Sequence, residues 1–202
     1  MITALSSICL LIISTFATAR AEPIAATQAP SLEQMAGQMI MTGFQGTSPG
    51  DPAVQQIGRQ LREGIIGGVI LYAYNIQSRE QVRRLTAFLS DQCPGASPFI
   101  AVDQEGGLVQ RLTAANGFGN TPSASSMARL SLVNNYILYR RMAAMVHDAG
   151  FTVNFTPVVD LIVDPDSPAI SRLGRSYSAC PQRVSNHARV CVMAHRRHNV
   201  VT

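Results

Sequence analysis

Short β-rich runs alternate with longer helical patterns along the sequence, and this alternation occurs four times. Such alternation is typical of βα units, in which each helix returns the chain so that successive strands run parallel. The sequence therefore predicts an α/β fold with about four βα units plus the start of a fifth strand. The expected strands cover residues 38–44, 67–72, 98–102 and 153–159, followed by a stub at 200–202.

Helix-start signals support this division of the chain. Ser31 and Ser78 are each followed three residues later by Gln, which is the pattern of a capping box. Asp51 is expected to cap a further helix that runs to about residue 62. Two long helices are expected over residues 128–149 and 181–198, each preceded by a polar loop, 106–125 and 161–179.

The composition indicates a folded chain with a sizeable core, since 47% of its 202 residues are hydrophobic and 14% are charged. The formal net charge is +4, and all 16 basic residues are Arg. These arginines are scattered, apart from short pairs such as Arg140-Arg141, and no basic stripe carries interleaved aromatic residues. The pattern therefore argues against a nucleic-acid partner.

The first 21 residues resemble a signal peptide. An apolar run over residues 8–16 precedes Ala19-Arg20-Ala21, a small-x-small cleavage pattern before Glu22. The run is shorter than the roughly 20 apolar residues that span a bilayer. We therefore expect export to the periplasm or the extracellular space, with an uncleaved anchor as the alternative. Residues 22–30 are expected to form a flexible lead-in to a domain over 31–202, and no later segment is apolar enough to span a membrane.

Cysteine and histidine spacings match no zinc pattern, so no metal site is expected. Cys180 and Cys191 are candidates for a disulfide bridge, with free buried thiols as the alternative. His195 and His198 are three residues apart, which allows a surface metal contact. Exposed, unliganded positions on the last helix are the favoured interpretation of both histidines.

Two carboxylates, Asp103 and Asp160, follow expected strands. Capping or ion pairing is the ordinary role of an Asp at such a position. In parallel α/β barrels, however, functional groups gather where the strands end. Position alone leaves both roles open.

Residues 101–111 read A-V-D-Q-E-G-G-L-V-Q-R and resemble the V-D-Q-E-G-G-x-V-x-R signature of bacterial family-3 β-N-acetylhexosaminidases. Three further segments, at residues 67–76, 153–160 and 164–178, are similar to other motifs of that family, so the resemblance covers about 31–202. It implies a (β/α)8 TIM barrel, which needs eight strands and about 250 residues, so that this chain is an incomplete barrel. Open sheet edges and exposed apolar surface are expected to follow.

The resemblance implies that Asp103, Arg111 and Arg175 bind the sugar. Glu105 and Asp160 are expected to support the site, and two glycines after Glu105 to permit a turn. A salt bridge from either arginine to Asp103 or Glu105 is the structural alternative. The sequence departs from the family pattern at Leu108, Tyr74 and Cys180. The first two departures change polar contacts near the expected pocket rim and leave the substrate range open.

The implied activity is retaining hydrolysis of terminal β-linked N-acetylglucosamine, without a cofactor, in amino-sugar glycans such as cell-wall fragments. Retaining hydrolysis needs a nucleophile and an acid/base group on opposite sides of the bond. The family's Lys-His segment, its His–Asp acid/base pair and its Asp nucleophile are all expected beyond Thr202, so no catalytic residue is assigned here. The chain would then need a missing C-terminal half. The alternative is an inactive, truncated or sugar-binding remnant.

Overall fold

The computed structural model describes residues 30–93 and 97–202 of the chain. The expected signal peptide and residues 22–29 of the expected lead-in lie outside this described part. Four strands form one parallel sheet in the order β1-β2-β3-β4. Val201 adds a parallel bridge to Val153 beyond β4, as expected for the beginning of a fifth strand. The strands are β1 (Met41–Gly43), β2 (Gly68–Leu71), β3 (Phe99–Val102) and β4 (Val153–Asn154).

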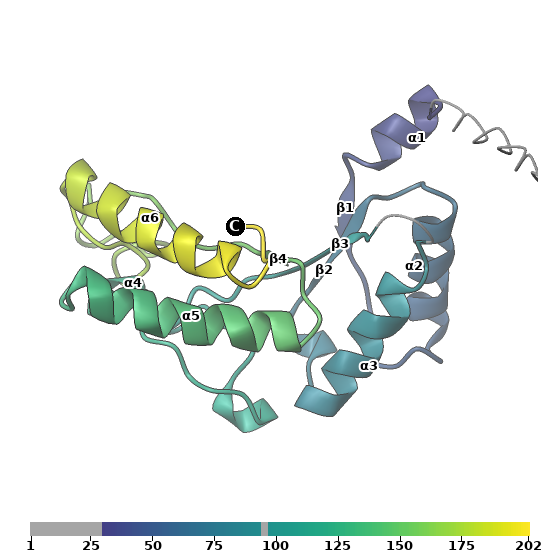
Figure 1. Cartoon of the computed structure of the whole chain (residues 1–202), viewed down its shortest axis with the longest axis horizontal. Helices are drawn as coiled ribbons and strands as arrows, with labels where there is room; N and C mark the ends of the chain where they lie inside the picture. Colours follow the sequence, from purple (N-terminus) through teal and green to yellow (C-terminus); the bar gives the residue numbers. More distant parts are fainter. Residues whose placement is uncertain (1–29, 94–96) are drawn as a thin grey trace, which may run out of the picture.

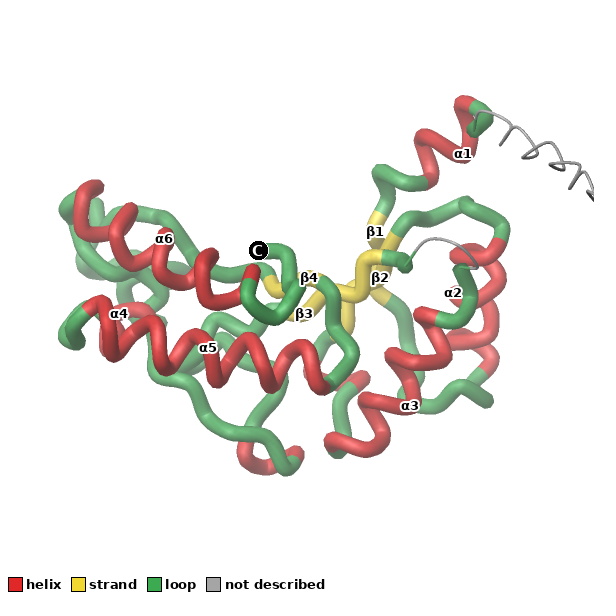
Figure 2. The backbone as a smooth tube through the Cα atoms, viewed as in Figure 1, coloured by secondary structure: helices red, strands yellow, loops and turns green. Residues whose placement is uncertain are grey.

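Helices follow the strands in the predicted alternation. In Figure 1, α2 and α3 lie at one end of the sheet, and α5 and α6 lie side by side at the other. Figure 2 shows the short strands between these two helical groups. The helices are α1 (Leu32–Gly37), α2 (Pro52–Arg62), α3 (Arg79–Ser90), α4 (Ala124–Met127), α5 (Leu132–Asp148) and α6 (Pro181–Arg196), with 3₁₀ turns η1 (Ala73–Asn75) and η2 (Ala114–Asn116).

The core forms where the sheet meets its helices. Val69, Leu71, Ile100 and Val102 of the two central strands are all buried. Leu85 and Leu89, four residues apart and so on one face of α3, are both fully buried. The sheet is therefore fixed by apolar packing, and the loops that follow its strands remain free to carry polar groups.

Several expected elements are shorter than predicted, among them the strand expected over 38–44, which covers only Met41–Gly43. The strand predicted over residues 153–159 ends at Asn154, because the amide of Thr156 bonds the Asn154 carbonyl at 2.8 Å and Pro157 has no N–H to donate. The helix predicted over 128–149 begins only at Leu132, as α5, and the short helix α4 precedes it at the end of the predicted polar loop. Ser131 begins α5, since its hydroxyl accepts a hydrogen bond from the amide of Asn134.

The capping predictions are confirmed in part. The capping box at Ser31 is complete. At Ser78 the hydroxyl accepts from the Gln81 amide, but the Gln81 side chain accepts from the amide of Gln77. Asp51 stands at the N-cap of α2, yet its carboxylate accepts from Thr47 and Ser48 in the preceding loop.

The disulfide alternative is wrong. Cys180 is exposed at the start of α6, and Cys191 is buried in the same helix, so both thiols are free. They are eleven positions apart along the helix, which separates them by roughly 16 Å, well beyond the reach of a disulfide. In the part of the chain that the structure describes, no helix is long and apolar enough to cross a membrane.

Candidate functional site

Three polar residues directly follow β3, and their side chains have different environments. Gln104 is fully buried, whereas Asp103 and Glu105 on either side of it each pair with an arginine. This fits extended backbone, in which alternate side chains point to opposite faces. The strand end therefore presents two carboxylates together and directs the intervening amide into the core.

Asp103 forms an ion pair with Arg111, whose Nη2 lies 3.1 Å from the Asp103 Oδ2. The Asp103 side chain is 23% exposed and the Arg111 side chain 24%, so solvent reaches both. Within the described residues, Asp103 Oδ1 and the Nε and Nη1 atoms of Arg111 make no side-chain hydrogen bond. Acceptor and donor groups thus lie side by side and remain free to bind a polar ligand.

Glu105 is held by Arg175 from the loop between β4 and α6. Arg175 donates from Nε to Oε2 at 2.8 Å and from Nη2 to Oε1 at 2.7 Å, and its Nη1 donates to the Ala169 carbonyl. The hydrogen bonds to Glu105 raise the pKa of Arg175, and the negative charges of Glu105, Asp160 and Asp103 act in the same direction. This pair joins two loops that are 70 residues apart in sequence.

Both arginines that were expected to bind sugar therefore also form the ion pairs given as the alternative. Asp160, expected at the end of a strand, lies six residues beyond the last residue of β4 and is exposed. Its backbone carbonyl accepts from the hydroxyl of Ser176. Among the described residues its carboxylate makes no ion pair, and it acts on Arg175 only through its charge.

A tight turn follows Glu105, as predicted from its two glycines. Gly106 and Gly107 have φ angles of 96° and 63°, in the left-handed region. A Cβ atom on Gly106 would lie 2.3 Å from the Pro122 carbonyl oxygen. The turn exposes the next residue, Leu108, and Tyr74 of η1 is also half exposed, so these two departures from the family pattern face solvent.

Two buried residues that support the site through hydrogen bonds were not predicted. Asn154 of β4 hydrogen-bonds the backbone of Gln104, and His195 of α6 hydrogen-bonds Asn154. The expected exposure of His195 is wrong, because its side chain is fully buried between α5, α6 and β4. The sequence pattern of α6 did not indicate this burial, because histidine is only intermediate among residue types in its tendency to be buried.

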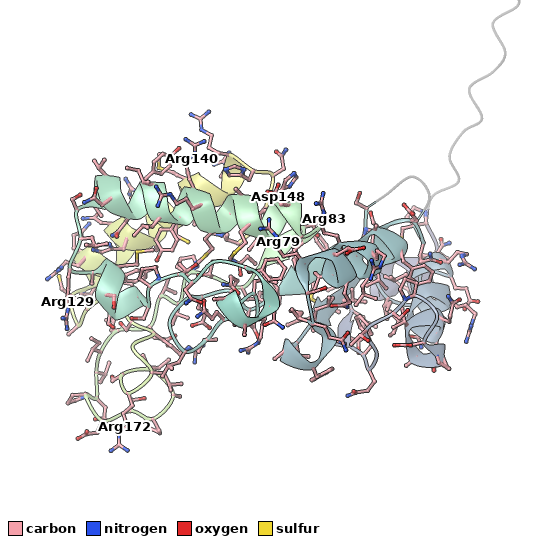
Figure 3. The ribbon with its side chains drawn as sticks, turned by 90° about the horizontal axis from the view of Figure 1, so that it is seen from below. Arg79, Arg83, Arg129, Arg140, Asp148 and Arg172 are labelled. Atoms are coloured by element: carbon pink, nitrogen blue, oxygen red, sulfur yellow. The ribbon has the colours of Figure 1, made fainter. Side chains whose placement is uncertain are left out.

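The described residues contain no group of three or more His, Cys, Asp or Glu side chains that could hold a metal ion. Two cavities of about 590 and 570 Å³ lie away from the carboxylate–arginine cluster, one along α6 and one beside α1 and α2. Basic side chains are spread over several elements, and Figure 3 shows Arg140 on α5 and Arg172 at the tip of the loop before α6.

Comparison with known proteins identifies similar hexosaminidases. The chain is 33% identical over 180 residues to Beta-hexosaminidase A of Pseudoalteromonas piscicida, a match that covers 79% of this chain and 30% of the relative. It is 32% identical over 155 residues to a Beta-hexosaminidase of Bordetella avium, which covers 71% of this chain and 41% of that protein. The chain thus spans less than half the length of either relative.

Two solved structures of similar fold are also N-acetylhexosaminidases or N-acetylglucosaminidases. A glycoside hydrolase family 3 beta-N-acetylglucosaminidase from Paenibacillus sp. superposes with a TM-score of 0.76 and 27% identity, over 85% of this chain and 32% of that structure. A Beta-N-acetylhexosaminidase from Beutenbergia cavernae gives a TM-score of 0.69 and 26% identity, over 86% of this chain and 52% of that structure. The four-stranded sheet is therefore part of a barrel. The model for the "Glycosyl hydrolase family 3 N terminal domain" matches residues 31–202, and the chain belongs to this family.

Proposed function

We propose that residues 31–202 form the sugar-binding part of a β-N-acetylhexosaminidase that hydrolyses terminal β-linked N-acetylglucosamine from amino-sugar glycans. The observation that carries the proposal is the partly exposed Asp103–Arg111 pair at the end of β3. The resemblance of residues 101–111 to the family signature and the names of the relatives support it. No cofactor is needed for this reaction.

The chemistry of the cluster suits a sugar. Oδ1 of Asp103 accepts hydrogen bonds from a sugar hydroxyl, and the remaining guanidinium donors of Arg111 bind hydroxyl or acetamide oxygens. Charge-assisted hydrogen bonds of this kind are roughly twice as strong as neutral ones. Arg175 has three nitrogens engaged by Glu105 and Ala169, so only its remaining Nη hydrogens reach the sugar.

Full activity in this proposal requires the rest of the barrel, from a longer polypeptide or a second one. Retaining hydrolysis uses a nucleophile and an acid/base group, and neither role is assigned to residues 31–202. The chain spans 30% and 41% of two relatives that are named hexosaminidases, which supports this division of labour. The competing function is an inactive remnant that at most binds sugar.

The test combines binding with hydrolysis. N-acetylglucosamine is titrated against the chain, against Asp103→Ala, and against Asp148→Ala as a control at an exposed carboxylate on α5. We expect binding by the wild-type chain and by the control, and its loss in Asp103→Ala. Equal binding by all three proteins, or none by the wild type, would contradict the proposed site.

Hydrolysis then separates the enzyme from the remnant. A chromogenic β-N-acetylglucosaminide is incubated with the 202-residue chain and with a version extended through the downstream reading frame. Turnover only by the extended version supports the proposal that residues 31–202 bind the sugar and the rest of the barrel supplies the catalytic groups. Turnover by the shorter chain itself would show that a catalytic group lies within it, and Asp103, Glu105 and Asp160 would be the first to test.

We also propose that the protein is exported, with cleavage before Glu22. The apolar run over residues 8–16 and the Ala19-Arg20-Ala21 sequence support this. N-terminal sequencing of the protein recovered from periplasm and medium tests it. A mature chain that retains Met1 would favour the uncleaved anchor.

A further inference from the structure

We propose that Asn154, Gln104 and His195 act as positioning residues that hold the Asp103–Arg111 pair in its sugar-binding geometry. This inference rests on the proposed function of that pair. None of the three side chains is expected to touch the sugar, because all three are fully buried. Their role follows from an unbroken series of hydrogen bonds that runs from α6 through β4 to the loop after β3.

The first link joins Asn154 to the backbone of Gln104. Asn154 Oδ1 accepts from the Gln104 amide at 2.9 Å, and Asn154 Nδ2 donates to the Gln104 carbonyl at 3.2 Å. Val102 and Asn154 are the last residues that pair between β3 and β4. Beyond them, the Asn154 side-chain amide makes the two hydrogen bonds that a further backbone residue of β4 would make. The backbone between Asp103 and Glu105 is thereby held in place although the neighbouring strand β4 has ended.

The second link joins Gln104 to the segment that carries Arg111. The Gln104 Oε1 accepts from the amides of Arg111 and Leu112, both at 2.9 Å, and its Nε2 donates to the Leu112 carbonyl at 3.1 Å. One buried side chain therefore sets the distance between the strand end and the returning loop. Asp103 lies directly before Gln104, so the same residue places both members of the ion pair.

The third link is His195. Its Nδ1 lies 2.9 Å from the Cys191 carbonyl, which can only accept, so Nδ1 carries the proton. Nε2 is then the acceptor for Asn154 Nδ2 at 3.1 Å. This third hydrogen bond fixes the orientation of the Asn154 amide, because a flipped amide would direct its oxygen toward the lone pair of Nε2.

A matched set of variants tests the series in the whole chain. Asn154→Ala removes the central amide. His195→Leu removes the acceptor, whereas His195→Gln keeps one within reach. Asn135→Ala is the control, because Asn135 is another fully buried amide that hydrogen-bonds a histidine, His187, but it lies between α5 and α6 without a link to Gln104.

The readouts are the dissociation constant for N-acetylglucosamine and the hydrogen-exchange rates of the Gln104, Arg111 and Leu112 amides. We expect Asn154→Ala to weaken binding by about tenfold or more, as is usual when a buried hydrogen-bond partner is left unpaired. His195→Leu should weaken binding as well, and His195→Gln should restore it. Hydrogen exchange at the Gln104, Arg111 and Leu112 amides should be faster in Asn154→Ala and His195→Leu than in the wild type and His195→Gln. Asn135→Ala should leave both readouts unchanged.

Equal binding by wild type and Asn154→Ala would overturn the proposal, as would identical behaviour of His195→Leu and His195→Gln. If Asn154→Ala does not fold, the two His195 variants decide the matter. If the wild-type chain binds no N-acetylglucosamine, the proposed function fails. The exchange rates then still show whether Asn154 orders the loop, so the two failures are distinguishable.

Discussion

Arg175 binds Glu105 through two parallel hydrogen bonds, from Nε at 2.8 Å and from Nη2 at 2.7 Å. The Glu105 side chain is only 10% exposed, so its carboxylate is more shielded than that of Asp103, which is 23% exposed. It fastens the loop before α6 onto the end of β3. The pair therefore contributes more to loop structure than a surface salt bridge does.

Arg175→Lys is expected to loosen this junction, because a lysine ammonium cannot make the two-pronged contact. We expect a loss of about 1–2 kcal/mol in the free energy of unfolding. Urea titration measures it, with Arg172→Lys as the control at an exposed arginine of the same loop. Equal stabilities of the two variants would show that the paired geometry contributes nothing.

Gly106→Ala is expected to destabilise the chain by about 1–3 kcal/mol, since an L-residue there is strained and its Cβ would clash with the Pro122 carbonyl. Gly119→Ala is the matched control, because a Cβ at Gly119 has no heavy atom within 4 Å. Thermal unfolding of both variants checks the difference. A Gly106→Ala protein as stable as Gly119→Ala would mean that the turn relaxes without cost.

Stability is expected to fall under mildly acidic conditions because of His195. Burial lowers the pKa of His195 from its ordinary value of 6.5, and nearby His198 adds to the effect, while the Cys191 carbonyl opposes it. Tyr139 and the Cys191 thiol face the ring as neutral groups. Below about pH 6.5 the unfolded chain binds a proton at His195 that the folded chain does not bind, so the folded state loses stability as the pH falls. The contribution of neutral His195 to stability is therefore complete above about pH 6.5 and declines below it.

The measurement is the free energy of unfolding from about pH 8 to about pH 5, on either side of the ordinary histidine pKa, for the wild type and His195→Gln. The wild type should lose stability as the pH falls through this range, and His195→Gln should lose less. His187 also has a pKa lowered by burial, so some dependence should remain in the variant. A wild-type curve that is flat or that rises toward acid would contradict the expected direction.

Self-association is expected at raised protein concentration, because large apolar side chains are exposed on and beside the sheet. Phe99 is 47% exposed, Phe155 45% and Val201 55%. Among the described strands, β1 has a partner on one side only. The chain should therefore bind the dye ANS and form oligomers as its concentration rises, in a sedimentation experiment.

Val201→Arg should reduce this association by placing a charge at the edge of the sheet. Met193→Arg is the control, since Met193 is equally exposed, at 53%, but lies on α6. A wild-type chain that stays monomeric without dye binding would show that its open face is covered by other means. Equal effects of the two variants would show that the added charge, and not its place at the sheet edge, reduces association.

Much of the fold could be predicted from the sequence because its signals are local. The capping box at Ser31 and the positions of the strands depend on residues close together in the chain, and the structure confirms them. The segment over 101–111 likewise holds Asp103, Glu105 and Arg111 within eleven residues, so the sequence by itself was enough to indicate the candidate site. The roles of these residues toward a sugar stay predictions.

The tertiary structure decided what depends on long-range contacts. Nothing near Asn154 in the sequence shows that its amide meets Gln104, 50 residues away, or that His195 lies beneath both. The length of β4 and the choice of Glu105 as the partner of Arg175 were set in the same way. Local patterns fix where elements begin and which face is apolar, but only packing determines which buried polar groups find each other, because an unpaired one is too costly to bury.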